Sequence, residues 1–329
     1  MHVLVVGGAG YIGSHTAGAF LDAGHSVTVI DNLATGLREN IFPESRFIHA
    51  DILNQRALEA AFARAAEEEP AHALVHLAAF KAAGESMVEP EKYAENNISG
   101  TISLLNAAVA AGVEDVVFSS SAAVYGEPTY LPVDENHPTK PTNFYGYTKL
   151  AIEELLRWYA DLKGVRYAAL RYFNAAGYDP RGRVHGLELN PANLLPVIME
   201  VAVGIRESLT IFGNDYDTRD GTGIRDYVHV TDLARAHVLA LHHIRENRTN
   251  LTVNLGSEEG ISVMEMLETA RRETGREIPA EVGARRAGDP AALVASAGQA
   301  RAILGWNPEF SDVTSLVRTT WAAYERALL

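Results

Sequence analysis

The chain of 329 residues contains no cysteine. This absence excludes disulfides, thiolate nucleophiles and cysteine-ligated zinc, and it fits a reducing compartment. Also missing is a run of about 20 apolar residues, the length that a transmembrane helix requires, and the amino-terminal apolar run is too short for a signal peptide. We therefore expect a cytoplasmic protein without a membrane partner. No carboxylate cluster accompanies His237, His242 and His243, so no metal is predicted.

Basic residues are few relative to acidic ones. The chain has 28 Lys and Arg against 42 Asp and Glu, a formal net charge of -14. This balance argues against a nucleic-acid partner, because such binding depends on Lys and Arg that neutralise phosphates. An anionic small ligand would have to be bound locally, by a few arginines and backbone N–H groups. Low-complexity tracts and internal repeats are absent as well, and the length suits two modules.

The first half of the chain alternates short β-branched runs with helical stretches, the pattern of a parallel sheet covered on both faces. The expected strands are His2–Val6, Ser26–Ile30, Phe47–Ala50, Ala73–Leu77, Asp115–Ser119 and Tyr167–Arg171. The expected helices lie near Ser14–Ala23, Gln55–Glu68, Glu91–Ala111 and Tyr145–Leu162. The fold class is therefore α/β, a doubly wound parallel (Rossmann) sheet with a smaller mixed α/β domain. We place the first domain at residues 1–175, with residues 226–255 returning to it, and the second at residues 176–329.

A glycine-rich turn, Gly7-Gly8-Ala9-Gly10-Tyr11-Ile12-Gly13, follows the first expected strand and opens the first helix. Glycines permit a tight turn and a close approach of the backbone to a pyrophosphate at the helix N-terminus. Such a run alone also occurs in ordinary strand–helix turns. The second strand leads into Asp31, whose carboxylate would bind an adenosine ribose and repel a 2′-phosphate. Together the two features predict NAD rather than NADP.

Two further strand ends carry candidate cofactor contacts. Asp51-Ile52 follows the third strand, where a polar residue would reach the adenine, although a helix N-cap explains Asp51 nearly as well. Leu77-Ala78-Ala79-Phe80-Lys81 follows the fourth strand, and its small residues would let the chain pass close to the cofactor. Lys81 equally fits a solvated loop lysine.

Tyr145 and Lys149 lie four residues apart at the start of an expected helix, and this spacing puts them on one face. A free tyrosine has a pKa of about 10, so it is a poor base at neutral pH. A cation about 4 Å away is worth roughly 4 kcal/mol at an effective dielectric near 20. We expect this to lower the pKa of Tyr145 enough for general-base catalysis. A Tyr–Lys pair on a solvated helix surface is the alternative.

Ser119-Ser120-Ser121 ends the fifth strand, at the edge of the sheet where ligands of such folds bind. A hydroxyl there would hydrogen-bond the reacting oxygen and relay its proton to Tyr145. Strand termination and capping explain a serine triplet equally well in isolation. Combined with Tyr145 and Lys149, however, Ser121 indicates a site for hydride transfer between a carbonyl and an alcohol.

Several of these segments together resemble a known family. The glycine turn, Asp31-Asn32-Leu33, Lys81 and the Tyr145–Lys149 pair resemble the extended short-chain dehydrogenase/reductase superfamily. Within it, Arg171–Asn174, Ile211–Tyr216 and Asp220–Tyr227 are similar to the UDP-glucose 4-epimerase family. The resemblance covers essentially the full length, down to Leu304-Gly305-Trp306.

The resemblance implies the binding residues. Those for NAD are Gly7, Gly10, Tyr11, Ile12, Gly13, Asp31, Asn32, Leu33, Ala34, Thr35, Gly36, Asp51, Ile52, Leu77, Ala78, Ala79, Phe80, Lys81, Asn96, Ser121, Tyr145, Lys149 and Phe173. Those for a UDP-sugar are Ser121, Tyr145, Asn174, Asn193, Leu194, Phe212, Arg225, Arg286, Asp289 and Leu293. The arginines suit a pyrophosphate, because a guanidinium fork matches phosphate oxygens.

The resemblance also implies the reaction, the reversible C4 epimerisation of UDP-glucose and UDP-galactose through a 4-keto intermediate with tightly bound NAD. Catalysis would be carried by Tyr145, Lys149 and Ser121. Another NAD-dependent nucleotide-sugar enzyme of the superfamily is the first alternative, but Ala122-Ala123 after Ser121 lacks the acid/base pair of a dehydratase. A dehydrogenase that releases NADH also fits the spacing. A non-catalytic NAD sensor is the other alternative, and it should have lost Tyr145 and Lys149.

Three positions depart from the family pattern. Ala192 stands where many members have an asparagine, Ala123 where many have a threonine, and Leu293 where many have a tyrosine that limits the 2-substituent of the sugar. We hypothesise that the smaller Leu293 admits UDP-N-acetylhexosamines. The resemblance further implies a homodimer, with the helix at residues 91–111 as the candidate interface.

Overall fold

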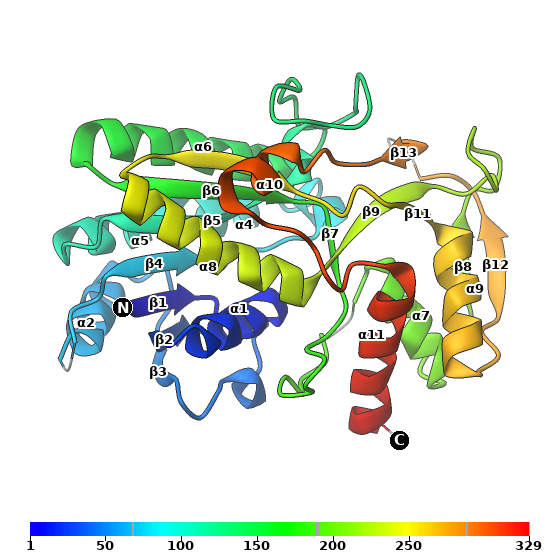
Figure 1. Ribbon diagram of the computed structural model, residues 1–329, viewed down its shortest axis with the longest axis horizontal. Helices are drawn as coiled ribbons and strands as arrows, with labels where there is room; N and C mark the ends of the chain where they lie inside the picture. The colour runs from blue at the N-terminus through cyan, green and yellow to red at the C-terminus, as the bar shows by residue number, and fades with distance from the viewer. Residues whose placement is uncertain (68, 189–190, 287–288, 329) are drawn as a thin grey trace.

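The computed structural model describes residues 1–67, 69–188, 191–286 and 289–328. Its larger part is a seven-stranded sheet in the order β10-β6-β5-β4-β1-β2-β3, with every neighbouring pair parallel (Figure 1). The strands are β1 (His2–Val6), β2 (Ser26–Asp31), β3 (Arg46–His49), β4 (Ala73–His76), β5 (Asp115–Ser121), β6 (Arg166–Tyr172) and β10 (Leu251–Leu255). The doubly wound fold expected from the sequence is confirmed.

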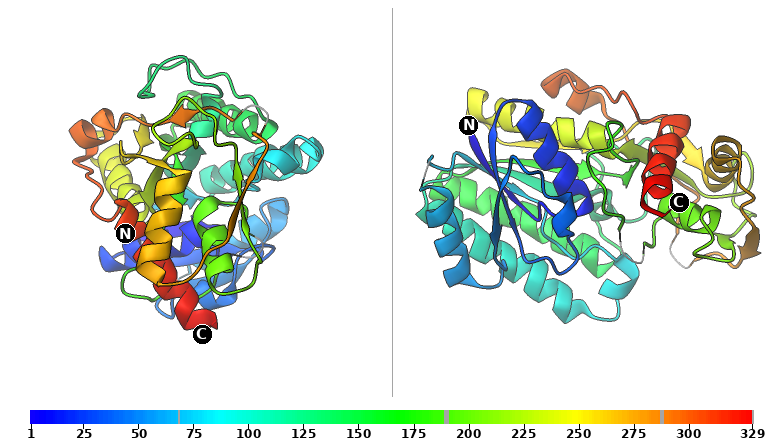
Figure 2. Two further views of the ribbon diagram at one scale, coloured as in Figure 1. Left: turned by 90° about the vertical axis from the view of Figure 1, so that its right-hand side faces the viewer. Right: turned by 90° about the horizontal axis from the view of Figure 1, so that it is seen from below.

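The strands are apolar because helices cover both faces of the sheet. All five residues of β1 are buried. One face is covered by α1 (Tyr11–Asp22), α8 (Val230–Asn247) and α10 (Gly298–Leu304), and the other by α2 (Gln55–Ala65), α5 (Gly100–Ala110) and α6 (Phe144–Lys163) (Figure 2). α1 begins three residues before its predicted start, and Glu68, the predicted end of α2, lies outside the described residues. In the described part of the chain, every helix is too short or too polar to cross a bilayer.

The helix expected over residues 91–111 is interrupted, which corrects the prediction. It consists of α4 (Pro90–Tyr93), a π-helical segment (Ala94–Ser99) and α5. The extra residue in the π turn is typical of functional positions, and here it accompanies an inward-facing Asn97. The Asn97 amide accepts a hydrogen bond from the Phe80 N–H at 2.9 Å and donates to the Thr148 hydroxyl at 3.1 Å. Asn97 therefore ties the loop after β4 to α6, a tertiary contact with no signature in the apolar pattern.

A second module lies beyond the carboxyl ends of the parallel strands (Figure 1). Its helices α7 (Leu194–Ala202), α9 (Val263–Thr274) and α11 (Val313–Leu328) pack around one apolar cluster that includes Leu195, Met266 and Leu316. One small sheet contains β7 (Asn174–Ala176), β9 (Ile224–His229), β11 (Gly260–Ser262) and β13 (Ala292–Leu293). A separate pair is formed by β8 (Leu209–Phe212) and β12 (Ala280–Gly283).

The chain passes between the two modules more than once. β9 belongs to the small sheet of the second module, whereas the next two elements, α8 and β10, belong to the first. β10 pairs with β6 at the edge of the large sheet, and α8 packs beside α1. Near the carboxyl end, the Trp306 indole donates to the Asp232 carbonyl of α8 at 2.8 Å. These contacts position β9 directly against the carboxyl edge of the sheet.

Candidate active site

A cavity of about 690 Å³ opens at the carboxyl edge of the sheet. It is lined by residues that follow β1, β2, β4, β5 and β6, and by Gly186, Leu187, Glu188 and Asn193 from the second module. The strand order reverses between β1 and β4, and the ends of these two strands lie at the centre of the wall. Open α/β sheets bind their ligands at this topological switch point.

The glycine turn after β1 allows two close backbone approaches. Gly7 has a φ of +83°, and a Cβ there would lie 2.6 Å from the Ala78 nitrogen after β4. A Cβ on Gly13 would lie 2.0 Å from the Gly7 carbonyl oxygen. α1 starts directly after Gly10, which provides no side-chain cap. The first N–H groups of α1 are therefore available to a phosphate, and the glycine cradle fits a dinucleotide.

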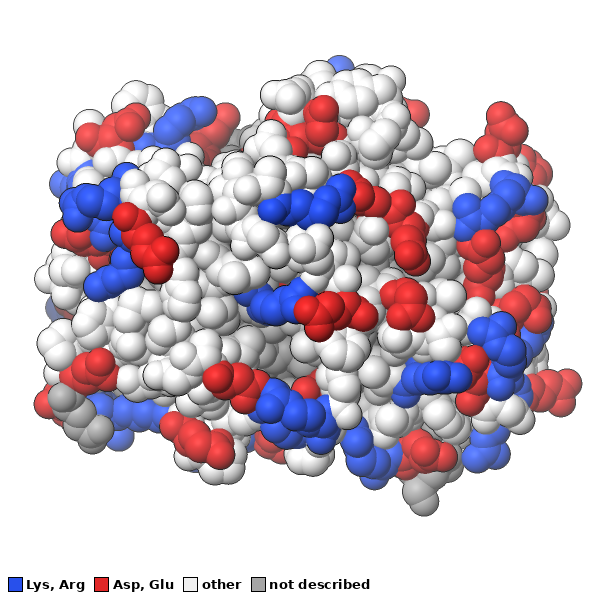
Figure 3. All heavy atoms as spheres, in the orientation of Figure 1, with Lys and Arg blue, Asp and Glu red and all other residues white. Residues whose placement is uncertain are grey.

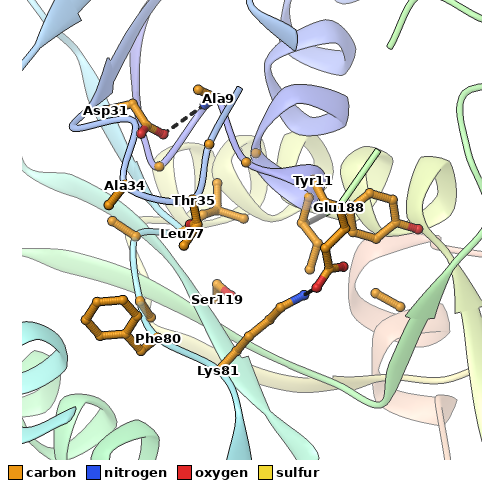
Figure 4. A pocket seen from close by; sticks show the side chains of 18 of the residues that line it. Ala9, Tyr11, Asp31, Ala34, Thr35, Leu77, Phe80, Lys81, Ser119 and Glu188 are labelled. Atoms are coloured by element: carbon orange, nitrogen blue, oxygen red, sulfur yellow. Dashed lines mark hydrogen bonds and ion pairs between the residues drawn. The ribbon is translucent and has the colours of Figure 1, made fainter. Parts of the chain in front are cut away.

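Asp31 lies at the end of β2, on the same wall of the cavity. Its carboxylate accepts hydrogen bonds from the N–H groups of Ala9 at 3.0 Å and Leu33 at 2.8 Å (Figure 4). Asp51 stands behind this turn and accepts from the Asn32 amide at 2.9 Å. The N-cap of α2 is Asn54, so the alternative explanation of Asp51 as that cap is wrong. Asp51 instead holds the loop that carries Asp31.

The end of β4 forms the opposite wall. Leu77, Ala78 and Ala79 line the cavity together with Phe80 and Lys81. Lys81 extends across the opening and makes an ion pair of 2.7 Å with Glu188 of the second module (Figure 4). Lys81 is therefore not a free loop lysine. Its ion pair joins the first module to the second across the cavity.

Ser121, Tyr145 and Lys149 converge on the cavity wall next to these strand ends. The start of α6 is held by two caps: the Asn143 side chain accepts from the Gly146 N–H at 2.8 Å, and the Ser86 hydroxyl accepts from the Tyr145 N–H at 3.0 Å. Lys149 Nζ donates to the Ser119 carbonyl at 2.8 Å and lies 5.8 Å from the centre of the Tyr145 ring. The predicted surface alternative for the Tyr–Lys pair is thus wrong, because Lys149 is buried.

The ionisation of this set differs from the sequence-based expectation. Burial raises the pKa of Tyr145, and a hydrogen bond with Ser121 only partly opposes the rise. Burial also lowers the pKa of Lys149 to about 7, against an opposing effect of Glu153. The prediction that the pKa of Tyr145 is lowered is therefore wrong for the protein without a bound ligand. Desolvation sets the direction of both shifts, and Lys149 Nζ, which is 5.8 Å from the centre of the Tyr145 ring, is hydrogen-bonded to the Ser119 carbonyl instead.

The residues predicted to bind a UDP-sugar form a second group around β9. Arg225 is ion-paired with Asp289, and Arg286 stacks over the Phe212 ring, 3.8 Å from its centre. Leu293 is the register partner of Arg225 between β13 and β9. Asn174 connects this group with the cavity, because it lines the cavity wall and donates to the Asp226 carbonyl at 2.9 Å.

Most predicted NAD residues line the cavity. The exceptions are Leu33, which belongs to the loop after Asp31, and Asp51, which holds that loop from behind. Of the predicted substrate residues, Ser121, Tyr145, Asn174 and Asn193 line the cavity, whereas Leu194, Phe212, Arg225, Arg286, Asp289 and Leu293 belong to the second module beyond it.

Other residues on the wall were not predicted. They are Val6, Ala9, Ile30, Leu37, Asn40, Ala50, Ala82, Glu85, Tyr93, Ser119, Ser120, Tyr172, Ala175, Gly186, Leu187 and Glu188. Ala9 lies inside the predicted glycine turn and Ala50 ends a predicted strand, so both could have been found by counting every residue of those segments. Glu188 lies in a loop without a local signal.

Asp226 is a further residue that sequence reasoning missed. It is buried next to Arg225 and accepts hydrogen bonds from the N–H groups of Ser257 at 2.7 Å, Glu258 at 3.1 Å and Ala295 at 3.1 Å. Burial raises the pKa of Asp226 to about 6 despite these donors. Asp226 thereby fixes the strand that carries Arg225 against the loops on either side.

The molecular surface agrees with the acidic composition. On the face shown in Figure 3, basic side chains lie beside acidic ones. The ion pairs of the chain include Arg235–Glu309 and Arg301–Glu258. This mixed arrangement is that of a solvated surface rather than of a site that tracks a phosphate backbone.

A doubly wound sheet with a glycine cradle, an acidic residue after β2 and a Ser–Tyr–Lys set at its carboxyl edge defines an NAD-dependent enzyme of the short-chain dehydrogenase/reductase type. Comparison with known proteins narrows this class. Residues 3–256 match the model of the NAD dependent epimerase/dehydratase family. The chain belongs to this family and, within it, to the UDP-glucose 4-epimerases, and the cofactor of the family is NAD.

The similarity to individual members extends over the whole chain. UDP-glucose 4-epimerase of Lacticaseibacillus casei is 46% identical over 326 residues, which cover 99% of this chain and 97% of that protein. The crystal structure of UDP-glucose 4-epimerase from Brucella ovis in complex with NAD has a TM-score of 0.94 at 44% identity and 98% coverage of both chains. The structure of the UDP-Glc/GlcNAc 4-epimerase from Campylobacter jejuni has a TM-score of 0.86 at 37% identity and 99% coverage of both chains.

Proposed function

We propose that this chain interconverts UDP-glucose and UDP-galactose by inverting carbon 4 of the sugar, with NAD as a resident cofactor. One observation carries the proposal: Ser121, Tyr145 and Lys149 converge on the cavity that also holds the glycine turn and Asp31. A proton-transfer set and a dinucleotide cradle in one cavity are what a reversible oxidation of an alcohol requires.

The residues of the chain divide the proton chemistry among them. Tyr145 accepts the proton of the 4-hydroxyl and later returns it, and Ser121 hydrogen-bonds the same oxygen. The Lys149 ammonium stabilises the Tyr145 phenolate that this transfer requires. When bound, NAD supplies the acceptor and donor of hydride for carbon 4. Inversion requires the sugar to turn its other face to Tyr145 between the two proton transfers.

We assign the UDP part of the substrate to the group around β9. Arg225 and Arg286 would bind the pyrophosphate, and Arg225 would exchange its present partner Asp289 for phosphate oxygens. Asn174 links this group to the cavity that contains Tyr145. In this division, residues 1–175, with the stretch 226–255, hold NAD, and residues 176–329 hold the UDP-sugar.

The test is to incubate the purified protein with UDP-galactose and without added cofactor. Formation of UDP-glucose without release of NADH is the expected result. Accumulation of NADH would indicate a dehydrogenase, a 4-keto-6-deoxy product a dehydratase, and NAD binding without turnover a sensor. Each of these three results contradicts the proposal.

We extend the proposal to UDP-N-acetylhexosamines because of Leu293. This residue and Phe173 pack against the buried cluster of Ala122, Val124, Tyr125 and Val133, which begins directly after Ser121 in the chain. A leucine there leaves more room for a 2-substituent than a tyrosine would. Replacing Leu293 with tyrosine should therefore reduce turnover of UDP-N-acetylgalactosamine much more than turnover of UDP-galactose. If the unaltered protein turns over UDP-galactose but is wholly inactive on UDP-N-acetylgalactosamine, the extension is wrong.

A homodimer in the cytoplasm is part of the same proposal. Tyr147, Trp158 and Leu162 are exposed along α6, at positions that share a side of the helix. The Tyr159 hydroxyl of α6 bonds Asn106 of α5 at 2.8 Å, so α5 lies alongside this apolar row. We expect a dimeric mass by light scattering, and a monomeric one for Trp158→Glu. A monomeric mass for the unaltered protein would contradict this.

A further inference from the structure

Three consecutive serines at the end of β5 have three different partners. The Ser119 carbonyl accepts a hydrogen bond from Lys149 Nζ, and the Ser121 hydroxyl accepts one from the Ala123 N–H at 3.2 Å and lies near Tyr145, whose pKa it lowers. The Ser120 side chain points to the opposite face of the strand, because side chains alternate, and there it donates to the Glu153 carboxylate of α6. The strand end is therefore bonded both to the reacting groups and to a buried acid behind them.

Glu153 is the centre of a buried polar network. Arg171 of β6 binds its carboxylate with two hydrogen bonds, of 2.9 Å from Nε and 2.6 Å from Nη2. Arg171 Nη1 also donates to the Tyr125 hydroxyl at 2.9 Å, which donates in turn to Asn254 of β10 at 2.6 Å. The network thus joins β5, β6 and β10 with α6 behind the active site. A buried ion pair rarely adds stability over well-packed apolar side chains, so its presence here requires another explanation.

The position of Glu153 along α6 provides that explanation. Glu153 follows Lys149 by one helical turn, and its charge raises the pKa of Lys149 against the lowering caused by burial. Other titratable groups near Lys149 are Tyr145 from α6, whose ring centre lies 5.8 Å from Nζ, His76 from β4, and Tyr172 from β6, which lines the same cavity. Burial lowers the pKa of His76 to about 3 and raises the pKa values of both tyrosines, so these three are neutral. Among the described residues, the charge that acts on Lys149 is that of Glu153, which Arg171 binds.

We propose that Glu153 is a positioning residue, which Arg171 and Ser120 orient so that its carboxylate keeps Lys149 in the ammonium form beside Tyr145. This inference rests on the proposed function. Glu153 does not contact the substrate and acts only through Lys149.

The proposal has a distinctive consequence for the pH profile. The reaction needs Tyr145 as phenolate, and the phenolate forms mainly in molecules whose Lys149 is an ammonium, because that charge stabilises it. Below the pKa of Lys149 nearly every lysine is charged, and the phenolate fraction rises about tenfold for each pH unit. Above that pKa, most molecules that have lost one of the two protons have lost it from Lys149. The fraction of molecules with a Tyr145 phenolate and a Lys149 ammonium therefore stays constant as the pH rises further. The turnover number kcat therefore rises with pH and levels off at a break point set by Lys149.

The experiment compares kcat of the NAD-loaded unaltered protein, Glu153→Gln and Arg171→Gln between about pH 5 and about pH 9. For Glu153→Gln we expect the break point to move to lower pH. Below the new break point kcat should be unchanged. Above it, the constant value of kcat should be about tenfold lower for each pH unit by which the break point has moved. Arg171→Gln breaks the same ion pair but keeps the carboxylate, which Ser120 still holds, so its break point should not move to lower pH. A purely structural role would give both variants the same loss at every pH.

Asp115→Asn is the matched control. Asp115 is a buried carboxylate at the other end of β5, bonded to Arg166 at 2.6 Å and Arg245 at 2.8 Å. Its replacement breaks a comparable network far from Lys149, and the break point should stay in place. If Glu153→Gln does not fold, the double variant Glu153→Met with Arg171→Met replaces the pair by apolar side chains, and we expect the same downward displacement.

Three results would overturn the inference. The first is an unmoved break point in Glu153→Gln, or in the double variant if Glu153→Gln does not fold. The second is the same pH profile for Glu153→Gln and Arg171→Gln, and the third is a displaced break point in Asp115→Asn. A lack of epimerase activity in the unaltered protein would instead overturn the proposed function itself. The two failures are therefore distinguishable.

Discussion

Replacing Lys149 with methionine removes the ammonium and keeps most of the side-chain volume. Lys149 Nζ lies 5.8 Å from the centre of the Tyr145 ring. If the ring centre stands for the phenolate charge, a unit charge at this distance and an effective dielectric near 20 stabilises the phenolate by roughly 3 kcal/mol. Loss of that stabilisation reduces the phenolate fraction about 100-fold. Below neutral pH, we therefore expect kcat of the variant to be about 100-fold lower than that of the unaltered protein.

The deficit depends on pH, and the pKa of Lys149 sets its direction. Because burial lowers that pKa to about 7, the unaltered protein has the full benefit of the ammonium below pH 7 and loses it as the pH rises through 7. Methionine does not titrate, so the phenolate fraction of the variant keeps rising where the unaltered protein levels off. The deficit should shrink about tenfold for each unit above pH 7 and close near about pH 9.

The assay is the initial rate of conversion of UDP-galactose to UDP-glucose at saturating substrate. Each rate is divided by the fraction of protein that holds NAD, because Lys149 is also predicted to bind the cofactor. A deficit of the same size at every pH would refute the reasoning, since it would mean that Lys149 does not act through its charge. A deficit that grows above pH 7 would refute the assigned order of deprotonation.

Three further substitutions test the cofactor cradle. Gly13→Ala should abolish NAD retention and lower the thermal unfolding midpoint, because its Cβ would lie 2.0 Å from the Gly7 carbonyl oxygen, and a variant purified with NAD would contradict this. Asp31→Asn should weaken NAD binding about tenfold or more and narrow the preference over NADP, since a charge-assisted hydrogen bond is lost. Titration of the cofactor-free protein measures both affinities, and unchanged values would argue against the assigned ribose contact. Glu188→Gln removes the 2.7 Å ion pair with Lys81 across the cavity, so NAD should be lost faster during dialysis while the loaded enzyme keeps its rate. Equal retention in both proteins would show that this ion pair does not hold the cofactor.

The sequence by itself determined the features that depend on spacing within one element or one turn. The apolar runs predicted six of the seven strands of the large sheet, all but β10, because both faces of a parallel sheet are buried. The Gly7–Gly13 turn and Asp31 each follow a strand directly, so their place at the carboxyl edge followed from the alternation of strands and helices. Tyr145 and Lys149 share a helix face by periodicity alone.

Tertiary structure alone decided which groups are desolvated and which partners they meet across elements. Glu153, Arg171 and Asn254 come from three separate elements, and only the strand order and register bring them together behind Lys149. The pKa values of Tyr145 and Lys149 followed the same rule: spacing predicted their proximity, but burial set the direction of both shifts. The ion pair of Lys81 with Glu188 and the π turn at Asn97 likewise depend on contacts between distant segments. Such contacts leave no periodic signal in the sequence, because they join distant segments. Their energy also depends on how much water the packing removes from around the groups.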